Sequence, residues 1–441
     1  MYYLSYYNLK RRTVKIGIER KTAPLVLFCT LSFLLGMSMV WWLVDVDLTK
    51  PALAQRTDFL NAFYIAGAIM ARGSLHELYP PLEADSQVDF EFAKVAHSLL
   101  PYLPVNSQPC WQYPPIDAQF LSLFAGLPSS TALLTWQILS IAAIGASVFF
   151  VSRFAKVHWA IVSSLFIIFL PFFQTLKFGQ QGILFGLFPL CAALYLLGRD
   201  KPFIAGLVVS LTFLTLKFLV IAGLISLALL PNQRRMLIGL ATGCFILVGF
   251  MLATVPFLTC LQWLHNIQLS EKYFFEPHFY HNLSLYVSFP ALLILHFPIE
   301  FRTFGKILFY LLAVTILAVT MFIQWRLMNS KLPLEQKLRI VFASAFYVMP
   351  VILPHLLYYD LAGIMVANIL LWDVQPSSLI SQKLRAAAIT STLAIDAYFI
   401  CFAVLNNSSF HPLIFSSVLT LVYLQLLWIV KNTVAQTKGE H

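Results

Sequence analysis

The chain has 441 residues, of which 59% are hydrophobic and only 11% are charged, and its mean hydropathy is +0.79. Because a soluble domain carries charge on roughly a quarter of its residues, this composition excludes a soluble globular protein. We predict an all-α polytopic membrane protein whose apolar segments face lipid or one another. The net charge of +10 does not indicate a nucleic-acid partner, because the basic residues stand in short clusters between apolar runs.

These basic clusters predict how the chain is oriented. Lys and Arg concentrate in the cytoplasmic loops of membrane proteins, so we assign every cluster to that side and expect anionic membrane lipids as partners. The clusters lie at residues 10–21, 153–156, 199–201, 234–235, 326–339, 383–385 and 431–438. Residues 1–23 and 432–441 then become cytoplasmic ends of a single domain, residues 24–431, in the cell membrane.

The apolar runs predict the first half of the path. A spanning helix at about 24–44 leads out of the cytoplasm. A long outer segment follows, at about 45–127. Further spans are predicted at about 128–152, 157–175 and 182–198.

Residues 202–230 begin and end beside basic clusters but are too short for two full spans. We predict two short helices that fold back near Lys217, which is tolerated where helices line a polar cavity. The remaining spans are predicted at about 236–257, 306–325, 338–354, 358–373, 384–405 and 411–430, with an outer loop at 258–283 and an interfacial or re-entrant segment at 283–297. Together these segments give about 12 crossings.

The first outer segment contains a candidate functional carboxylate. Residues 57–73 predict an amphipathic helix with Phe59, Phe63 and Ala66 on one face. Asp58 stands at the start of this helix. One interpretation is that its carboxylate caps the free amides of the helix, and the other is a functional role at the outer surface.

Aromatic and basic side chains near the predicted outer surface also have two interpretations. The stretch from Trp111 to Pro115, which includes Tyr113, is typical of an interfacial aromatic anchor. Lys177 stands at an outer helix end. Its side chain either extends so that the ammonium reaches the membrane–water interface, or it has a function. Lys217 lies inside an apolar run, where an ionisable residue is costly and usually functional. Two such cations would suit a lipid-linked phosphate or pyrophosphate.

The sequence does not predict a metal site. Cysteines stand singly, and only the pair Cys110 and Cys260 falls on the predicted outer side, where the two could form a disulfide. His265, His278 and His281 have no regular ligand spacing. We therefore expect no metal and no cofactor, and leave the disulfide open.

Several short motifs occur in one order along the chain. They are Asp58 at a helix start, Leu78-Tyr79-Pro80, Tyr113-Pro114-Pro115, Phe178-Gly179-Gln180-Gln181, Ala205-Gly206, Leu216-Lys217, Asn282-Leu283-Ser284 and Pro354-His355. With these motifs the chain resembles glycosyltransferase family 87 from about residue 25 to 375. The resemblance implies a GT-C fold, a transmembrane bundle with its active site at the extracytoplasmic face. It also implies transfer of a hexose, with mannose as the expected sugar, from a polyprenyl-phosphate donor to a lipid or glycan acceptor, with inversion at the anomeric carbon.

The resemblance assigns roles to individual residues. Asp58 becomes the catalytic base that takes the proton of the acceptor hydroxyl. Cations are expected where charge develops on the departing phosphate, and these are Lys217, Lys177 and His355. The polar groups expected to contact the sugar or the acceptor are Gln180, Asn282 and Tyr113.

Two alternatives remain open. A transporter or flippase of lipid-linked sugars would bind the same ligand without chemistry, although the chain shows no internal repeat of the kind that many transporters have. The other alternative is a family member that has only a scaffolding role.

Overall fold

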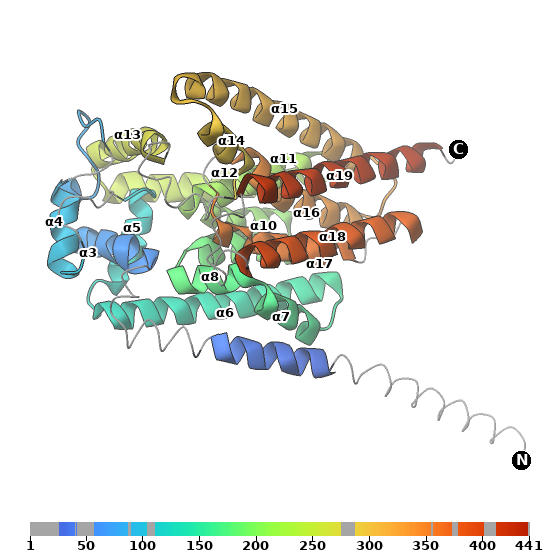
Figure 1. The fold of residues 1–441 in the computed structure, drawn as a ribbon, viewed down its shortest axis with the longest axis horizontal. Coiled ribbons are helices and arrows are strands. Elements are labelled where there is room, and N and C mark those ends of the chain that lie inside the picture. Colours follow the sequence, from blue (N-terminus) through green and yellow to red (C-terminus); the bar gives the residue numbers. More distant parts are fainter. Residues whose placement is uncertain are drawn as a thin grey trace, which may run out of the picture.

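The computed structural model describes residues 26–39, 41, 57–86, 90–103, 111–274, 287–353, 356–372, 378–400 and 412–439. Over these residues the chain is helical and forms no strand, which confirms the predicted all-α class. Figure 1 shows a bundle of longer helices with a group of shorter ones at one end. This group comprises α3 (Ile65–Arg72), α4 (Phe90–Leu99), α5 (Pro115–Leu121) and α13 (Phe257–Phe274).

Four helices in the described part of the chain are long and apolar enough to cross a membrane. They are α6 (Ser129–Ala155), α12 (Leu230–Thr254), α15 (Arg302–Met328) and residues Phe415–Asn432 of α19 (Pro412–Gly439). The bent pair α7 (Trp159–Ile168) and α8 (Leu170–Phe178) makes a fifth if it is counted as one span. These helices make the chain a membrane protein, and the total of about 12 crossings stays a prediction.

The span predicted at 157–175 is not one straight helix, because α7 and α8 meet at an angle of 66°. Phe169 between them has extended backbone angles. Pro171 lies in the first turn of α8. Its ring would clash with a preceding helical turn, so α7 cannot run on into α8 as one helix. The amide of Leu170 donates instead to the Asp396 carboxylate, at 3.1 Å. Asp396, in α18 (Ser378–Phe399), therefore satisfies a backbone group that the break leaves without a helical partner.

Two short helices occupy residues 202–230, as predicted. The first comprises α10 (Pro202–Val209) and a 3₁₀ turn, η5 (Ser210–Leu214), and the second is α11 (Leu216–Ala228). The backbone leaves the helical region at Thr215, directly before Leu216 and Lys217. Gly206 lies against Gly239, and Ser210 against Gly243, so α10 runs parallel to α12.

A buried aromatic cluster holds the group of shorter helices against the bundle. Phe59 lies in η1 (Phe59–Tyr64), and its ring centroid is 5.2 Å from that of Trp136 in α6. The ring of Phe63 is likewise 5.2 Å from that of Trp111. Trp111 is only 1% exposed, so its interpretation as an interfacial anchor is wrong and it belongs to the core.

Of the outer loop predicted at 258–283, the described residues 258–274 are helical and belong to α13. Within α13, the Asn266 amide donates to the Trp111 carbonyl at 2.6 Å, and the Trp263 indole to the Gln112 carbonyl at 3.4 Å. These bonds connect the second outer segment to the first.

Helices α16 (Leu334–Ile352) and α17 (Ala362–Trp372) form the centre of the bundle, since nearly all their side chains are buried. The other described helices are η2 (Leu75–Glu77), η3 (Ser122–Phe124), η4 (Gly182–Leu187), α9 (Phe188–Leu197), α14 (Phe289–His296), η7 (Ile299–Phe301) and η8 (Tyr358–Leu361). The 3₁₀ turn η8, directly before α17, carries Tyr359 and Asp360.

Candidate active site

Asp58 does not cap the helix that follows it. The structure shows no capping bond from its side chain, so the capping interpretation is wrong. Its Oδ2 accepts a hydrogen bond from the Gln180 side-chain amide. Because the neighbouring Phe59 is fully buried against Trp136, the position of Asp58 is fixed by core packing.

Gln180 reaches Asp58 because Gly179 ends α8. Gly179 has a φ of +66°, a left-handed conformation that glycine adopts without steric cost. A Cβ atom at this position would lie 2.5 Å from the Phe59 Cβ. Glycine is thus required both by the turn and by the close approach of η1 to α8.

Tyr359 extends this contact into the centre of the bundle. The Gln180 amide donates to the Tyr359 hydroxyl at 3.0 Å, and the Tyr359 hydroxyl is itself hydrogen-bonded to Asp58. The Lys217 ammonium lies 6.0 Å from the centre of the Tyr359 ring. Residues from three distant parts of the chain therefore meet at Asp58.

Lys217 forms an ion pair with Asp360, with 2.7 Å between Nζ and Oδ2. The same carboxylate oxygen accepts the Leu357 amide at 2.9 Å, which holds Asp360 in place. Lys217 is 27% exposed and Asp360 only 7%. An ammonium has three donors, and among the described residues only the Asp360 carboxylate accepts from it, so two donors can face another anion.

The electrostatics of this cluster favour an Asp58 that can exchange a proton near neutral pH. Burial raises the pKa of Asp58 to about 6, although the Gln180 hydrogen bond, the Lys217 charge and the Tyr359 hydroxyl act to lower it. A general base works best with a pKa close to the working pH. Asp58 has this property.

Tyr113 faces the same carboxylates. Burial raises its pKa, and the charges of Asp360, Asp58 and Asp117 raise it further. The ring packs against both Phe63 and Trp111. Tyr113 is therefore a protonated phenol that can donate a hydrogen bond beside Asp58.

Three residues of this site were not predicted from the sequence. Tyr359 and Asp360 stood in the segment after His355 without an assigned role, although Asp360 could have been found by the argument used for Lys217, an ionisable residue next to apolar runs. Asp117 is completely buried and neighbours Gln181, and burial raises its pKa well above the ordinary value. Nothing in its local sequence pattern indicated that α5 buries this face.

The remaining expected site residues are only partly placed. Lys177 lies in the last turn of α8, half-buried, one turn before Gln180. Asn282 and His355 lie outside the described residues, as do Cys110, His278 and His281. Cys260 is a buried free cysteine in α13, and its pairing with Cys110, which the sequence left open, is not tested. Among the residues that the structure describes, no group of three or more His, Cys, Asp or Glu side chains could hold a metal ion.

The model of glycosyltransferase family 87 matches residues 111–354, more than half of the chain. The chain belongs to glycosyltransferase family 87. Together with its apolar helices, this membership makes it a membrane glycosyltransferase. Comparison with curated proteins and with solved structures gave no match.

The family 87 match covers only part of the site. Tyr113, Gln180 and Lys217 lie within the matched residues, whereas Asp58 precedes them and Asp360 follows them. The match also covers fewer residues than the resemblance seen in the sequence, which runs from about residue 25 to 375. Asp58 and Asp360 are therefore connected to the matched segment by the geometry of the fold.

Proposed function

We propose that this membrane glycosyltransferase moves a hexose, with mannose as the proposed sugar, from a polyprenyl-phosphate donor to a lipid or glycan acceptor, with inversion. The reaction takes place at the extracytoplasmic face of the cell membrane, with both termini cytoplasmic. The proposed fold is a GT-C bundle of about 12 spans. The observation that carries the proposal is the contact of Asp58 with Gln180 and Tyr359, beside the Lys217–Asp360 ion pair.

In this mechanism Asp58 is the catalytic base. Inversion needs a single carboxylate that removes the acceptor proton while the acceptor oxygen attacks the anomeric carbon. Asp58 suits this role because the hydrogen bonds to it orient it without neutralising it. Asp360 does not, because its carboxylate already accepts from Lys217 and Leu357.

Lys217 is the proposed partner of the departing phosphate. A phosphate leaving group already carries charge, so it needs donors and cations more than a strong general acid. The two ammonium protons of Lys217 that do not face Asp360 can bind its oxygens, with Lys177 and His355 as further donors. Gln180, Asn282 and Tyr113 are proposed to hold the sugar or the acceptor. The reaction as proposed needs no metal or cofactor.

A turnover assay with defined variants tests this function. Purified protein receives labelled polyprenyl-phosphate-mannose and a membrane-lipid extract, and released polyprenyl phosphate and labelled product are measured. We expect Asp58→Asn to lower turnover by roughly 10²–10⁴-fold while donor binding persists. Glu83→Gln, an exposed carboxylate in the same outer segment, is the control and should retain wild-type turnover.

Normal turnover by Asp58→Asn would remove Asp58 from the catalytic role. If the wild-type protein binds the donor but never releases polyprenyl phosphate, movement of labelled donor across proteoliposomes becomes the decisive measurement. Such movement without release would identify a flippase and contradict the proposed reaction.

A further inference from the structure

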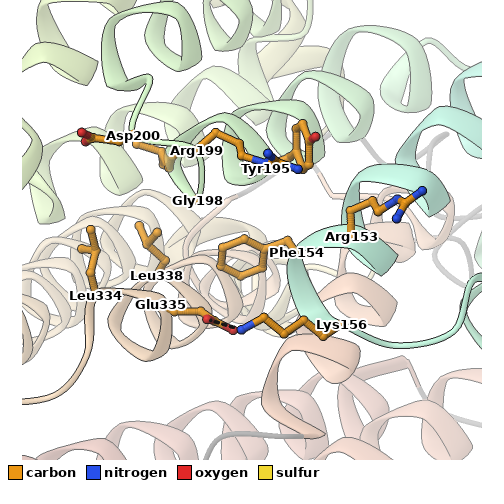
Figure 2. Close-up of a pocket in the computed structure, with 11 residues that line it drawn as sticks. Arg153, Phe154, Lys156, Tyr195, Gly198, Arg199, Asp200, Leu334, Glu335 and Leu338 are labelled. Carbon is orange, nitrogen blue, oxygen red and sulfur yellow. Dashed lines mark hydrogen bonds and ion pairs between the residues drawn. The ribbon is translucent and has the colours of Figure 1, made fainter.

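A pocket lies at the end of the bundle away from Asp58. It has a volume of about 490 Å³ and is formed by the last turn of α6, the end of α9 and the start of α16. Figure 2 shows its lining, in which three basic residues, Arg153, Lys156 and Arg199, occur with two acidic ones, Asp200 and Glu335. This volume falls within the range of small-molecule sites.

The pocket is separate from the proposed catalytic site. Gln137 of α6 donates to the Leu176 carbonyl at 3.4 Å, which places that turn of α6 beside the end of α8 and Gln180. Arg153 lies sixteen residues further along α6, roughly 24 Å away at about 1.5 Å per residue. A ligand in this pocket would not contact Asp58.

The acidic residues of the pocket do not neutralise its two arginines. Glu335 pairs with Lys156 at 2.8 Å and with Arg339 at 2.9 Å, so two cations already balance it. The Asp200 side chain points away from that of Arg199 (Figure 2). Within the described residues, neither Arg153 nor Arg199 forms an ion pair with a carboxylate.

Both guanidinium groups lie against aromatic rings. The Arg153 guanidinium lies 5.4 Å from the centre of the Phe149 ring, and that of Arg199 lies 5.3 Å from the centre of the Tyr195 ring. An arginine stacked on an aromatic ring keeps its donors free for a planar or tetrahedral anion. The pocket thus presents two arginines whose positions are already restricted.

The backbone beneath the pocket adopts two costly conformations. In the described part of the chain, Lys156 and Asp200 are the non-glycine residues with positive φ, at +58° and +56°, and both line the pocket. Glycine is the usual residue at such helix ends. Charged side chains therefore occupy positions that the backbone alone would give to glycine.

We propose that this pocket binds a phosphate group, and that the two arginines are its principal ligands. Arginine matches phosphate with paired, charge-assisted hydrogen bonds. The phosphate can belong to a membrane lipid or to a soluble compound. The surroundings of the pocket favour a lipid. Apolar side chains continue along α6 from the pocket and can contact an acyl chain, with Phe149 exposed at 47% and Ile141 at 43%.

Lipid retention by defined variants tests the proposal. The full-length protein is reconstituted in nanodiscs of phosphatidylcholine with a fraction of phosphatidylglycerol, extracted, and examined by native mass spectrometry for bound phosphatidylglycerol. In a second arm, the thermal unfolding of detergent-solubilised protein is followed with inorganic phosphate. Arg153→Gln/Arg199→Gln should bind phosphatidylglycerol at least about tenfold more weakly than the wild type, since it loses charge-assisted hydrogen bonds.

Arg326→Gln is the matched control, because this arginine also stacks on an aromatic ring, that of Phe322 at 4.7 Å, but does not line the pocket. Loss of lipid in the double variant alone supports a lipid headgroup. A soluble phosphate is supported if inorganic phosphate stabilises the wild type and not the double variant, and if the wild type retains no lipid.

Equal behaviour of the wild type and the double variant in both arms would overturn the proposal, and so would an equal loss in Arg326→Gln. Each protein must first elute as a single species in size-exclusion chromatography. If the double variant does not, Arg153→Gln and Arg199→Gln are measured singly, each with an expected loss of about threefold.

Discussion

Asp58 and Asp360 are close in space, yet their hydrogen bonds give them different properties. Asp58 accepts from an amide and a phenol, both neutral, whereas Asp360 accepts from the charged Lys217 and a backbone amide. Burial raises the pKa of Asp58 to about 6, whereas Asp360 is held in an ion pair with Lys217. Asp58 can therefore exchange a proton, and Asp360 serves to hold Lys217.

The pH dependence of turnover should report on Asp58. Because burial raises its pKa to about 6 and a base must be ionised to accept a proton, kcat/KM should fall about tenfold for each pH unit below 6. The Gln180 hydrogen bond lowers this pKa, so Gln180→Leu should move the acidic limb to higher pH. A profile measured from pH 4.5 to 8 checks both, and a limb that stays in place in Gln180→Leu would contradict the assignment.

The Lys217–Asp360 pair predicts a non-additive effect on stability. Asp360→Asn leaves the partly buried Lys217 without its counter-charge and should lower the free energy of unfolding by roughly 1–3 kcal/mol, less than for a fully buried pair. Lys217→Gln/Asp360→Asn removes both charges and should cost less than the sum of the two single variants. Thermal unfolding of the four proteins measures this coupling, and simple additivity would argue against the ion pair.

At the scale of elements, the ends and breaks of helices position the site more than the helices themselves do. Gly179 ends α8 beside Gln180, Thr215 ends η5 beside Lys217, and η8 carries Asp360. A break leaves side chains and backbone groups free to turn inward. Both Gln180, which bonds Asp58, and Lys217, whose charge acts on it, follow such an interruption.

Gly179→Ala tests the most demanding of these turns. The alanine Cβ would meet Phe59 at 2.5 Å while φ is +66°, so the variant should lose about 1–3 kcal/mol of stability, with a fall in turnover as η1 shifts. Gly145→Ala, in the middle of α6 with open space around it, is the control and should be neutral or stabilising by up to about 1 kcal/mol. Equal melting temperatures for both variants would show that this turn tolerates a side chain.

For the whole molecule, the sequence predicted the helical membrane class and the two short helices that break near Lys217. The structure brings Asp58 and Gln180 into contact, but the roles of Asp58, Gln180, Tyr113 and Lys217 came from the family resemblance and stay predictions. The helical class and the short helices could be predicted because run length and charge in apolar segments are local signals. The α7–α8 break and the burial of Trp111 were not predicted, because both depend on partners far along the chain. Leu170 needs Asp396, and Trp111 needs Phe63 and Asn266.

The pairing of Asp58 with groups near residue 360 has a consequence for the biogenesis of the protein. At roughly 5–20 residues per second, the ribosome completes Asp360 on the order of 15–60 s after Asp58. Throughout that interval the nascent chain already has its proposed base but lacks Tyr359 and the acidic partner of Lys217. Activity should therefore switch on only when the segment around residue 360, where the last fifth of the chain begins, has been inserted, so that an incomplete product cannot consume an activated sugar.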